Sequence, residues 1–541
     1  MRKIHSLRAG LGNVARALAF FGLCALTVHA QAGSSRTGAA TPEQRTARHF
    51  ETLRKSPPQM LAFLLQMPKG GDLHSHLSGA VYAESFIQWA ADKGLCVQQT
   101  TMVLSFPPCR QDAGQVEASA ALRSGLLYRQ MIDAWSMRYW QFSGQNGHDH
   151  FFDTFGKFGA ATVGQTGAML AEVAERAARG HVSYLELMLT PDSGLSSLIG
   201  QKVGLDSPTK RDQALSALLG EEIGQNGDFQ STLDKLKAEN IANAATIGAQ
   251  ALRDAEVEKA RLLKCGTPEA APGCAVTIRY VAQVSRGAAL SLVFAQMVTG
   301  FALANDPTSK VVAVNLVQPE DGFTSMQNFA REMRMLDFLH TIYPRAHITL
   351  HAGELAPGLV PPAGLSFHIR DSVEIAHAER IGHGVDIMHE DNSEALLKVM
   401  AERGVMVEIC LTSNDVILGI KGEQHPLAIY LRYGVPVALA TDDEGVARSE
   451  MSREYLRAAE EQGLGYVQLK TMARTSLQYA FLPGASLWSD ARRFVPVAQC
   501  AADAPAATTI SAACRQFLAG SERARLQRAL EDEFRAFESR Y

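Results

Sequence analysis

The chain carries, at residues 67–76, the sequence Met67-Pro68-Lys69-Gly70-Gly71-Asp72-Leu73-His74-Ser75-His76. This stretch has the form of a short β-strand that ends in two histidines. Side chains two residues apart in a strand project from the same face, so His74 and His76 can grip one metal ion. Imidazole nitrogen suits zinc, and also copper, iron and nickel. A histidine pair alone does not hold an ion, so the chain must supply further ligands.

Apolar segments like this one recur along the chain and are separated mostly by helical stretches. Their continuous apolar runs are typical of parallel strands that are covered on both faces. Strand–helix alternation repeated eight times predicts an α/β protein with a (β/α)8 TIM barrel. The predicted strands are Asp72–Leu77, Val182–Leu189, Val276–Val284, Val311–Val317, His347–His351, Arg380–Gly382, Val405–Cys410 and Val435–Thr441.

Two wide gaps between these strands indicate insertions into one domain. We expect the barrel over residues 67–485, with helical insertions at about 90–147 and 195–274. Residues 31–66 are expected to form a lead-in and, from about residue 44, a single helix. A helical C-terminal extension is expected over 486–541.

The composition is that of an ordinary globular protein. Of its 541 residues, 46% are hydrophobic and 20% are charged, and the net charge is −4. This balance, without a basic cluster that interleaves aromatic residues, argues against nucleic acid as a partner. An oligomer is compatible with the sequence, which does not specify one.

Residues 1–30 have the form of a secretory signal peptide. A basic front is followed by the short apolar run 17–28, and Val28-His29-Ala30 places small residues where a signal peptidase cuts. A membrane anchor is the alternative, but the run is too short to span a bilayer comfortably. We expect a secreted protein, periplasmic in a Gram-negative host, with no membrane attachment after cleavage.

Six cysteines of the mature chain fall into three close pairs, which in an exported protein predict disulfides. The seventh, Cys410, lies in an apolar run, where we expect a buried thiol. The predicted disulfides are Cys96–Cys109, Cys265–Cys274 and Cys500–Cys514.

Three further motifs place ionisable residues after predicted strands. His351-Ala352-Gly353-Glu354 follows the fifth strand, Ile381-Gly382-His383-Gly384 ends the sixth, and Thr441-Asp442-Asp443-Glu444 ends the eighth. The carboxyl ends of barrel strands meet at one mouth, where such enzymes build their sites. Taken singly, these loops could serve only as tight turns or helix caps. Together with the first histidine pair they predict a metal site.

The residue types suggest an assignment. Three imidazoles and one carboxylate leave room for a water on zinc, where it ionises near neutral pH. Glu354 can face the substrate as the proton carrier. His383 is either a fifth ligand or a partner of the attacking hydroxide, and Asp443 either accepts a substrate N–H or orients the water. The expected ligands are His74, His76, His351 and Asp442.

In their order along the chain, the motifs resemble those of the adenosine deaminase family of the amidohydrolase superfamily. The resemblance covers about residues 65–485 apart from the insertions, and the long chain with its export signal is similar in style to the secreted, growth-factor-type members. The matching segments are Met67-Pro68-Lys69, His74–Ala80, Tyr184–Leu187, His351–Glu354, Arg380–Gly384, Ser413-Asn414, His425-Pro426 and Thr441–Asp443.

The resemblance implies one Zn²⁺ per chain on the four expected ligands, and hydrolytic deamination of adenosine and 2′-deoxyadenosine, purine nucleosides, with release of ammonia. Glu354 would protonate N1 of the purine while His383 stabilises the hydroxide that attacks C6. Asp443 would contact N7, and Gly353 would lie near the base.

Two positions depart from the family pattern, and we expect both to contact the substrate. Ser78 stands where the family has an aspartate that contacts the ribose; a hydroxyl still hydrogen-bonds but carries no charge. Gln318 stands where the family has a glycine whose backbone N–H meets the purine. Another 6-aminopurine or an N-substituted purine is therefore an alternative substrate. An inactive extracellular binding protein is a further alternative. The intact Glu354 argues against it, because a binding protein does not need a proton carrier.

Two lesser features lie at residues 148–155. His148 and His150 are expected on the surface or at a pocket rim. The aromatic residues that follow are expected mainly in the core, with one of them lining the pocket: Phe151, Phe152 and Phe155.

Overall fold

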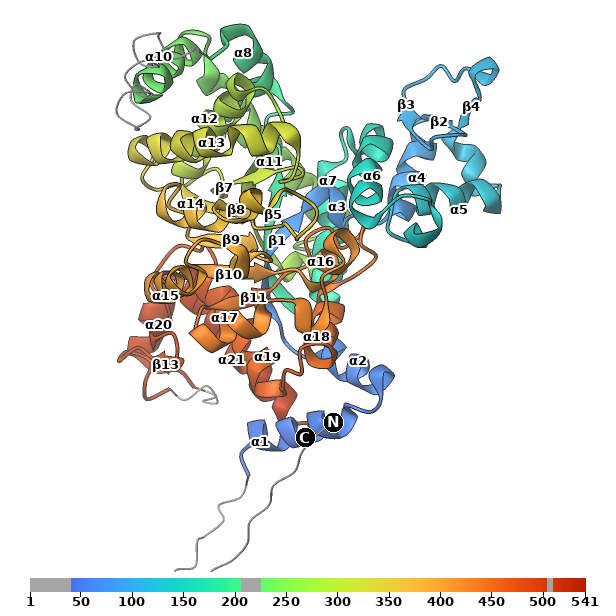
Figure 1. The fold of residues 1–541 in the computed structure, drawn as a ribbon. Coiled ribbons are helices and arrows are strands. Elements are labelled where there is room, and N and C mark those ends of the chain that lie inside the picture. Colours follow the sequence, from blue (N-terminus) through green and yellow to red (C-terminus); the bar gives the residue numbers. More distant parts are fainter. Residues whose placement is uncertain (1–39, 206–224, 504–508) are drawn as a thin grey trace, which may run out of the picture. The chain divides into compact units, whose positions relative to one another are not determined.

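Eight parallel strands form one sheet in which they follow one another in chain order (Figure 1). Beyond the last strand, Asp442 pairs with Ser75 in the first. The Asp442 N–H donates to the His74 carbonyl (2.8 Å), and the His76 N–H donates to the Asp442 carbonyl (2.9 Å). These bonds join the last strand to the first, so the predicted (β/α)8 barrel is confirmed. Its strands are β1 (Gly70–His76), β5 (Val182–Leu189), β6 (Thr277–Ser285), β7 (Val311–Val317), β8 (His347–Ala352), β9 (Arg380–His383), β10 (Met406–Ile409) and β11 (Val437–Leu439).

This computed structural model describes residues 40–205, 225–503 and 509–541. The predicted signal peptide lies outside these residues, as does the start of the lead-in. Residues 42–541 form one compact unit, to which every element described below belongs. None of the helices in the described ranges is long and apolar enough to cross a membrane.

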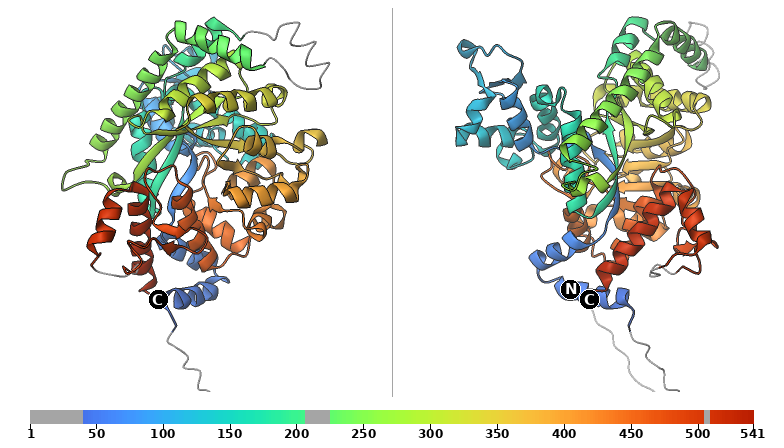
Figure 2. Two further views of the ribbon diagram at one scale, coloured as in Figure 1. Left: turned by 90° about the vertical axis from the view of Figure 1, so that its left-hand side faces the viewer. Right: turned by 180° about the vertical axis from the view of Figure 1, so that it is seen from behind.

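Helices cover the outside of the strands (Figures 1 and 2). Helix α12 (Leu290–Asn305) packs on β6 and β7 and is itself covered by neighbouring helices, which explains why it is apolar on nearly all sides. Around the barrel lie α3 (Leu77–Ala80), α6 (Gly147–Thr162), α7 (Thr166–Arg179), α13 (Phe323–Ile342), α14 (His368–Glu374), α15 (Ser393–Arg403), α16 (Leu411–Leu418), α17 (Leu427–Tyr433), α18 (Met451–Glu460) and α19 (Tyr466–Tyr479).

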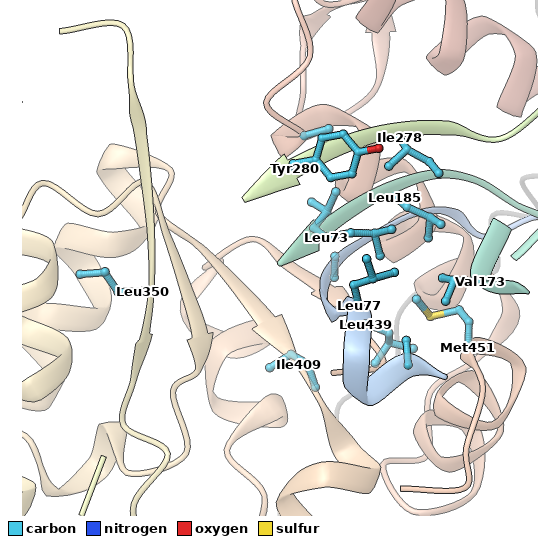
Figure 3. Close-up of a cluster of buried hydrophobic side chains, with 14 of the residues drawn as sticks. Leu73, Leu77, Val173, Leu185, Ile278, Tyr280, Leu350, Ile409, Leu439 and Met451 are labelled. Carbon is cyan, nitrogen blue, oxygen red and sulfur yellow. The ribbon is translucent and has the colours of Figure 1, made fainter. Parts of the chain in front are cut away.

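The core is built of side chains from several strands and from the helices that pack on them. Figure 3 shows Leu73, Leu185 and Leu439 from three strands, with Met451 of α18 nearby. Burial of each such side chain contributes about 1.5–3 kcal/mol. This packing holds the strand ends, and the residues that follow them, in fixed positions.

The helix expected over about residues 44–66 is instead two helices, α1 (Pro42–Leu53) and α2 (Pro57–Gln66). Pro57 and Pro58 lack a backbone N–H and cannot continue a helix from before. Proline is favoured in the first turn, where no such N–H is needed, so α2 begins at this pair.

The inserted and C-terminal segments contain short strands that the sequence did not predict. In the first insertion, with helices α4 (Ala83–Asp92) and α5 (Gly125–Ala134), β2 (Cys96–Gln98) pairs antiparallel with β3 (Leu104–Ser105) and β4 (Gln115–Glu117). Strands β12 (Trp488–Asp490) and β13 (Val495–Pro496) pair in the extension beside α20 (Ala512–Ala519) and α21 (Glu522–Glu538). The second insertion contributes α8 (Leu195–Val203), α10 (Gln225–Ala238) and α11 (Ile241–Leu262).

The three predicted disulfides are confirmed, and each closes a loop within an inserted or terminal segment. Cys410 is buried with a free thiol, as expected. The disulfides join Cys96 to Cys109, Cys265 to Cys274 and Cys500 to Cys514.

Candidate metal centre and active site

The four predicted ligands converge at the carboxyl end of the barrel. The Nε2 atom of His351 lies 3.1 Å from that of His74 and 3.2 Å from that of His76. The Asp442 Oδ1 atom lies 3.5 Å from His74 Nε2 and 3.4 Å from His76 Nε2. These four atoms all lie within 4.8 Å of one another, which is close enough to share one ion.

The second ring nitrogen of each histidine faces an oxygen. His74 Nδ1 lies 2.5 Å from Glu408 Oε2, and His351 Nδ1 lies 2.8 Å from the side-chain oxygen of Asn315. The weakest contact joins His76 to Gln283, at 3.4 Å. Because the outer ring nitrogens lie against oxygens, the three Nε2 atoms face one another, an arrangement that a cation in place of the His74 proton would stabilise. The residues therefore fit a metal ion.

A second set of potential ligands shares two members with the first. His383 and Cys410 lie near His74 and Asp442, and all four side chains are buried. The Cys410 thiol donates to the Glu408 carbonyl (3.8 Å). Burial holds the pKa of this thiol well above its usual range, which disfavours the thiolate that a metal requires.

Glu354 lies beside this centre and is held by a residue that sequence analysis did not assign. Glu320 accepts the backbone N–H of Gly353 (3.2 Å) through one oxygen and that of Glu354 (2.8 Å) through the other. Burial, followed by the charges of Asp442 and Glu320, holds the pKa of Glu354 well above its usual range. A raised pKa favours the protonated carboxyl group, which is the form that a general acid needs.

The two neighbouring aspartates differ in their contacts. Asp442 accepts the Ser413 hydroxyl (2.7 Å) through Oδ2, which leaves Oδ1 toward the histidines. Asp443 Oδ1 has no hydrogen-bond partner among the described residues. Gly79 provides the space for this carboxylate, since a Cβ there would lie 1.4 Å from Asp443 Oδ1. Asp443 is thus free to meet a ligand.

A cavity of about 280 Å³ opens beside these residues. Its lining includes Ser78 and Gln318, the two positions that depart from the family pattern, together with residues of the metal centre. It carries no lysine or arginine among the described residues. The lining residues are His76, Ser78, Phe151, Phe152, Phe155, Gln283, Ser285, Val317, Gln318, Pro319, His351, Glu354, Asp442 and Asp443.

Three predicted placements differ in the structure. All three phenylalanines of α6, rather than one, line the cavity, because the helix lies against the barrel mouth. Gly353 does not line it, and its N–H is engaged by Glu320. His148 is half-buried against Asp321 (3.0 Å), whereas His150 is buried rather than exposed and contacts the Ser136 carbonyl (3.1 Å).

The supporting residues that sequence analysis missed share one signal. Glu408 and Asn315 are single polar residues within otherwise apolar strands, β10 and β7. A buried polar group in such a run requires a partner, so it marks a supported site. Arg380 is the second partner of Glu408, since its Nε donates to Glu408 Oε1 (2.7 Å). Arg380 also pairs with Glu186 (2.5 Å).

The order and geometry of these residues agree with a comparison to known families. Residues 243–487 match the family model described as adenosine deaminase. This segment is similar to the adenosine deaminase family, and the model matches less than half of the chain.

Curated members of the family match over a limited stretch. The adenosine deaminase of Serratia proteamaculans is 40% identical over 136 residues, which cover 25% of this chain and 38% of the relative. That of Pectobacterium atrosepticum is 34% identical over 174 residues, covering 32% and 47%. The matched stretch thus spans less than half the length of these relatives.

The solved structures to which this chain is similar are more distant in sequence. The N6-methyl-AMP deaminase of Arabidopsis thaliana has 18% identity and a TM-score of 0.46, over 78% of this chain and 94% of its own. An amidohydrolase of Burkholderia ambifaria, solved with bound zinc, has 17% identity and a TM-score of 0.46, over 88% and 95%. At this similarity neither protein identifies a ligand of this chain.

Proposed function

We propose that this chain is a zinc-dependent hydrolase that deaminates adenosine and 2′-deoxyadenosine to inosine or deoxyinosine and ammonia. One observation carries the proposal. Three imidazole nitrogens and the Asp442 carboxylate converge within 4.8 Å of one another, beside a cavity that Glu354 also lines. We assign the catalytic domain to residues 67–485.

Zinc is the ion that this donor set suits best. Three neutral imidazoles and one carboxylate form a common zinc environment, in which a bound zinc ion would lower the pKa of a water and so supply a nucleophile near pH 7. His74, His76, His351 and Asp442 would hold the ion. Hydrogen bonds to Glu408 and Asn315 orient the rings of His74 and His351, and the Ser413 hydroxyl donates to Asp442 and orients its carboxylate.

Glu354 is the proton carrier in this proposal. Burial raises the pKa of Glu354 and so favours its protonated form, and its carboxyl group lies at the cavity. Transfer of that proton to N1 of a purine makes the ring carbon at C6 more electrophilic. The Glu354 carboxylate then takes the proton of the new C6 hydroxyl and passes it to the leaving ammonia, and the next water restores the proton on Glu354. Asp443 contacts N7 through its unpartnered oxygen.

The cavity favours an uncharged substrate. The phenylalanines of α6 offer apolar faces to a base, while Ser78 and Gln318 offer neutral hydrogen-bonding groups. A phosphate group would find no cationic side chain in the described lining. These features support a nucleoside or free base over a nucleotide.

Release of ammonia, or of methylamine in the case of N6-methyladenosine, from a panel of compounds tests the proposal. Zinc-loaded protein is expected to deaminate adenosine and deoxyadenosine more efficiently than adenine, AMP or N6-methyladenosine. Preference for N6-methyladenosine or adenine would favour the alternative of another 6-aminopurine or N-substituted purine, which the Ser78 and Gln318 departures suggest. If zinc-loaded protein releases no amine from any of these compounds, the result would favour the alternative of an inactive binding protein.

We also propose export from the cytoplasm. Three disulfides suit an oxidising compartment, and residues 1–30 have the pattern of a cleaved signal. The N-terminal sequence of protein recovered from the periplasm or medium is expected to begin shortly after residue 30. Recovery of the whole chain with an intact Met1 from the cytosol would contradict export.

A further inference from the structure

A chain of hydrogen bonds leads from the backbone of α17 to His383. The Leu427 N–H donates to His425 Nδ1 (3.2 Å), and His425 Nε2 lies 3.0 Å from the Asn414 Oδ1 atom. Asn414 Nδ2 in turn lies 3.0 Å from His383 Nδ1. All three side chains are buried, at 0–2% exposure. We propose that Asn414 and His425 are positioning residues that fix the tautomer of His383, leaving its ring proton on Nε2.

One group that can only donate determines which atom donates in every bond of this series of hydrogen bonds. A backbone N–H only donates, so the Nδ1 atom of His425 must accept and carries no proton. Burial, and then the positive charge of Arg457, lower the pKa of His425 to about 4, so the ring is neutral. Its single proton is therefore on Nε2.

The same logic passes through Asn414. The His425 Nε2–H needs an acceptor, so the oxygen of the Asn414 amide must face it. The amide nitrogen then faces His383 and donates to Nδ1. A neutral His383 that accepts at Nδ1 carries its proton on Nε2.

This tautomer gives His383 one role. Its Nε2 atom lies 3.7 Å from Glu354 Oε1 and 3.8 Å from Asp442 Oδ2, and has no hydrogen-bond partner among the described residues. A protonated Nε2 has no lone pair for a metal. His383 is thus a hydrogen-bond donor aimed between two carboxyl groups, not a fifth ligand.

The inference rests on the proposed function for its consequence. A donor at this point stabilises the negative oxygen that attacks the purine, whereas the other tautomer would face that oxygen with a lone pair. Helix α16 positions two of the side chains at this point. Ser413 hydrogen-bonds to Asp442, and the next residue, Asn414, hydrogen-bonds to His383.

Neutron diffraction of the deuterated, zinc-loaded protein tests the tautomer directly. Deuterium on His383 Nε2 and none on Nδ1 is expected, and deuterium on Nδ1 would overturn the inference. This readout needs no turnover. Protein with the expected tautomer that releases no ammonia from purines would overturn the proposed function alone, whereas active protein with Nδ1 deuterated would overturn the inference alone.

Matched variants test the chain of bonds. Asn414→Asp replaces the donor to His383 by an oxygen, so the tautomer is expected to reverse and kcat to fall roughly 10²-fold, with zinc content and KM kept. In His425→Gln the side-chain amide places an N–H near the position of Nε2. In His425→Asn the shorter side chain does not reach that position. His425→Gln is expected to keep kcat and the Nε2 proton, and His425→Asn to lose both. Equal kcat in the two folded, zinc-loaded His425 variants would overturn the inference.

Discussion

The Nδ1 atom of His74 lies 2.5 Å from Oε2 of Glu408, and both side chains are buried. Burial lowers the pKa of His74, but its contacts with Asp442 and Glu408 outweigh this and raise it to about 10. The pKa of Glu408 is instead lowered, to about 2, because the attraction of Arg380 and His74 exceeds the effect of burial. Glu408 is therefore an anion that orients a predicted metal ligand.

Glu408→Gln should weaken metal binding. The substitution keeps the shape but replaces an anionic acceptor of the His74 proton, and losses of this kind cost about 10–100-fold in affinity. Competition with a chelator measures the change. Glu454→Gln is the matched control, since Glu454 is also buried but accepts from Thr412 and Ser449. An equal effect of both variants would contradict a specific role for Glu408.

Glu354→Gln should separate metal binding from turnover. Glutamine retains the size of Glu354 but cannot transfer its proton, so turnover is expected to fall about 10²–10⁴-fold while the metal content stays at one ion per chain. His351→Ala, by contrast, should strip or weaken the ion. Metal analysis beside ammonia release distinguishes the two, and loss of metal from Glu354→Gln would overturn the assignment.

Gln318→Gly should relieve strain and change substrate recognition. Gln318 has φ +83°, a left-handed conformation that costs a residue with a Cβ about 1–2 kcal/mol. Its Oε1 accepts the Gly287 N–H (3.0 Å), which offsets part of that cost. We expect a rise of about 1 kcal/mol or less in the free energy of unfolding, with a changed KM for adenosine. An unchanged KM would remove Gln318 from the binding site.

Glu332→Gln should stabilise the protein increasingly as the pH rises. Burial raises the pKa of Glu332 to about 8, and neither oxygen has a partner among the described residues. The unfolded chain loses this proton near pH 4.5, whereas the folded chain keeps it until about pH 8. Stability of the native chain therefore falls across that window.

Thermal unfolding of Glu332→Gln from pH 5 to pH 9 measures this effect. The gain in Tm over the native chain is expected to grow up to about pH 8 and then level off. Glu394→Gln, at an exposed site on α15, should give no such trend. A gain that shrinks with rising pH would contradict the assigned shift.

The sequence predicted most of the barrel because its strands are continuous apolar runs. Val182–Leu189 and Val311–Val317 have the predicted bounds as β5 and β7. The convergence of the ligands was predictable because carboxyl ends of parallel strands meet at one mouth. The break at Pro57 was also readable, because two successive prolines cannot continue a helix from before.

Contacts between distant segments could not be predicted in the same way. Glu320 follows β7 and supports the turn after β8, so its role depends on the side-by-side placement of two strands. The three phenylalanines share a helical face that also suits a core, and only the position of α6 shows that they line the cavity. Short strands such as β3, of two residues, leave almost no periodic signal.

Anomalous diffraction at the zinc edge tests the central claim most directly. The account predicts one peak per chain, within coordination distance of His74 Nε2, His76 Nε2, His351 Nε2 and Asp442 Oδ1. A peak bounded instead by His383 and Cys410, or no peak at any of these residues in protein saturated with zinc, would contradict it.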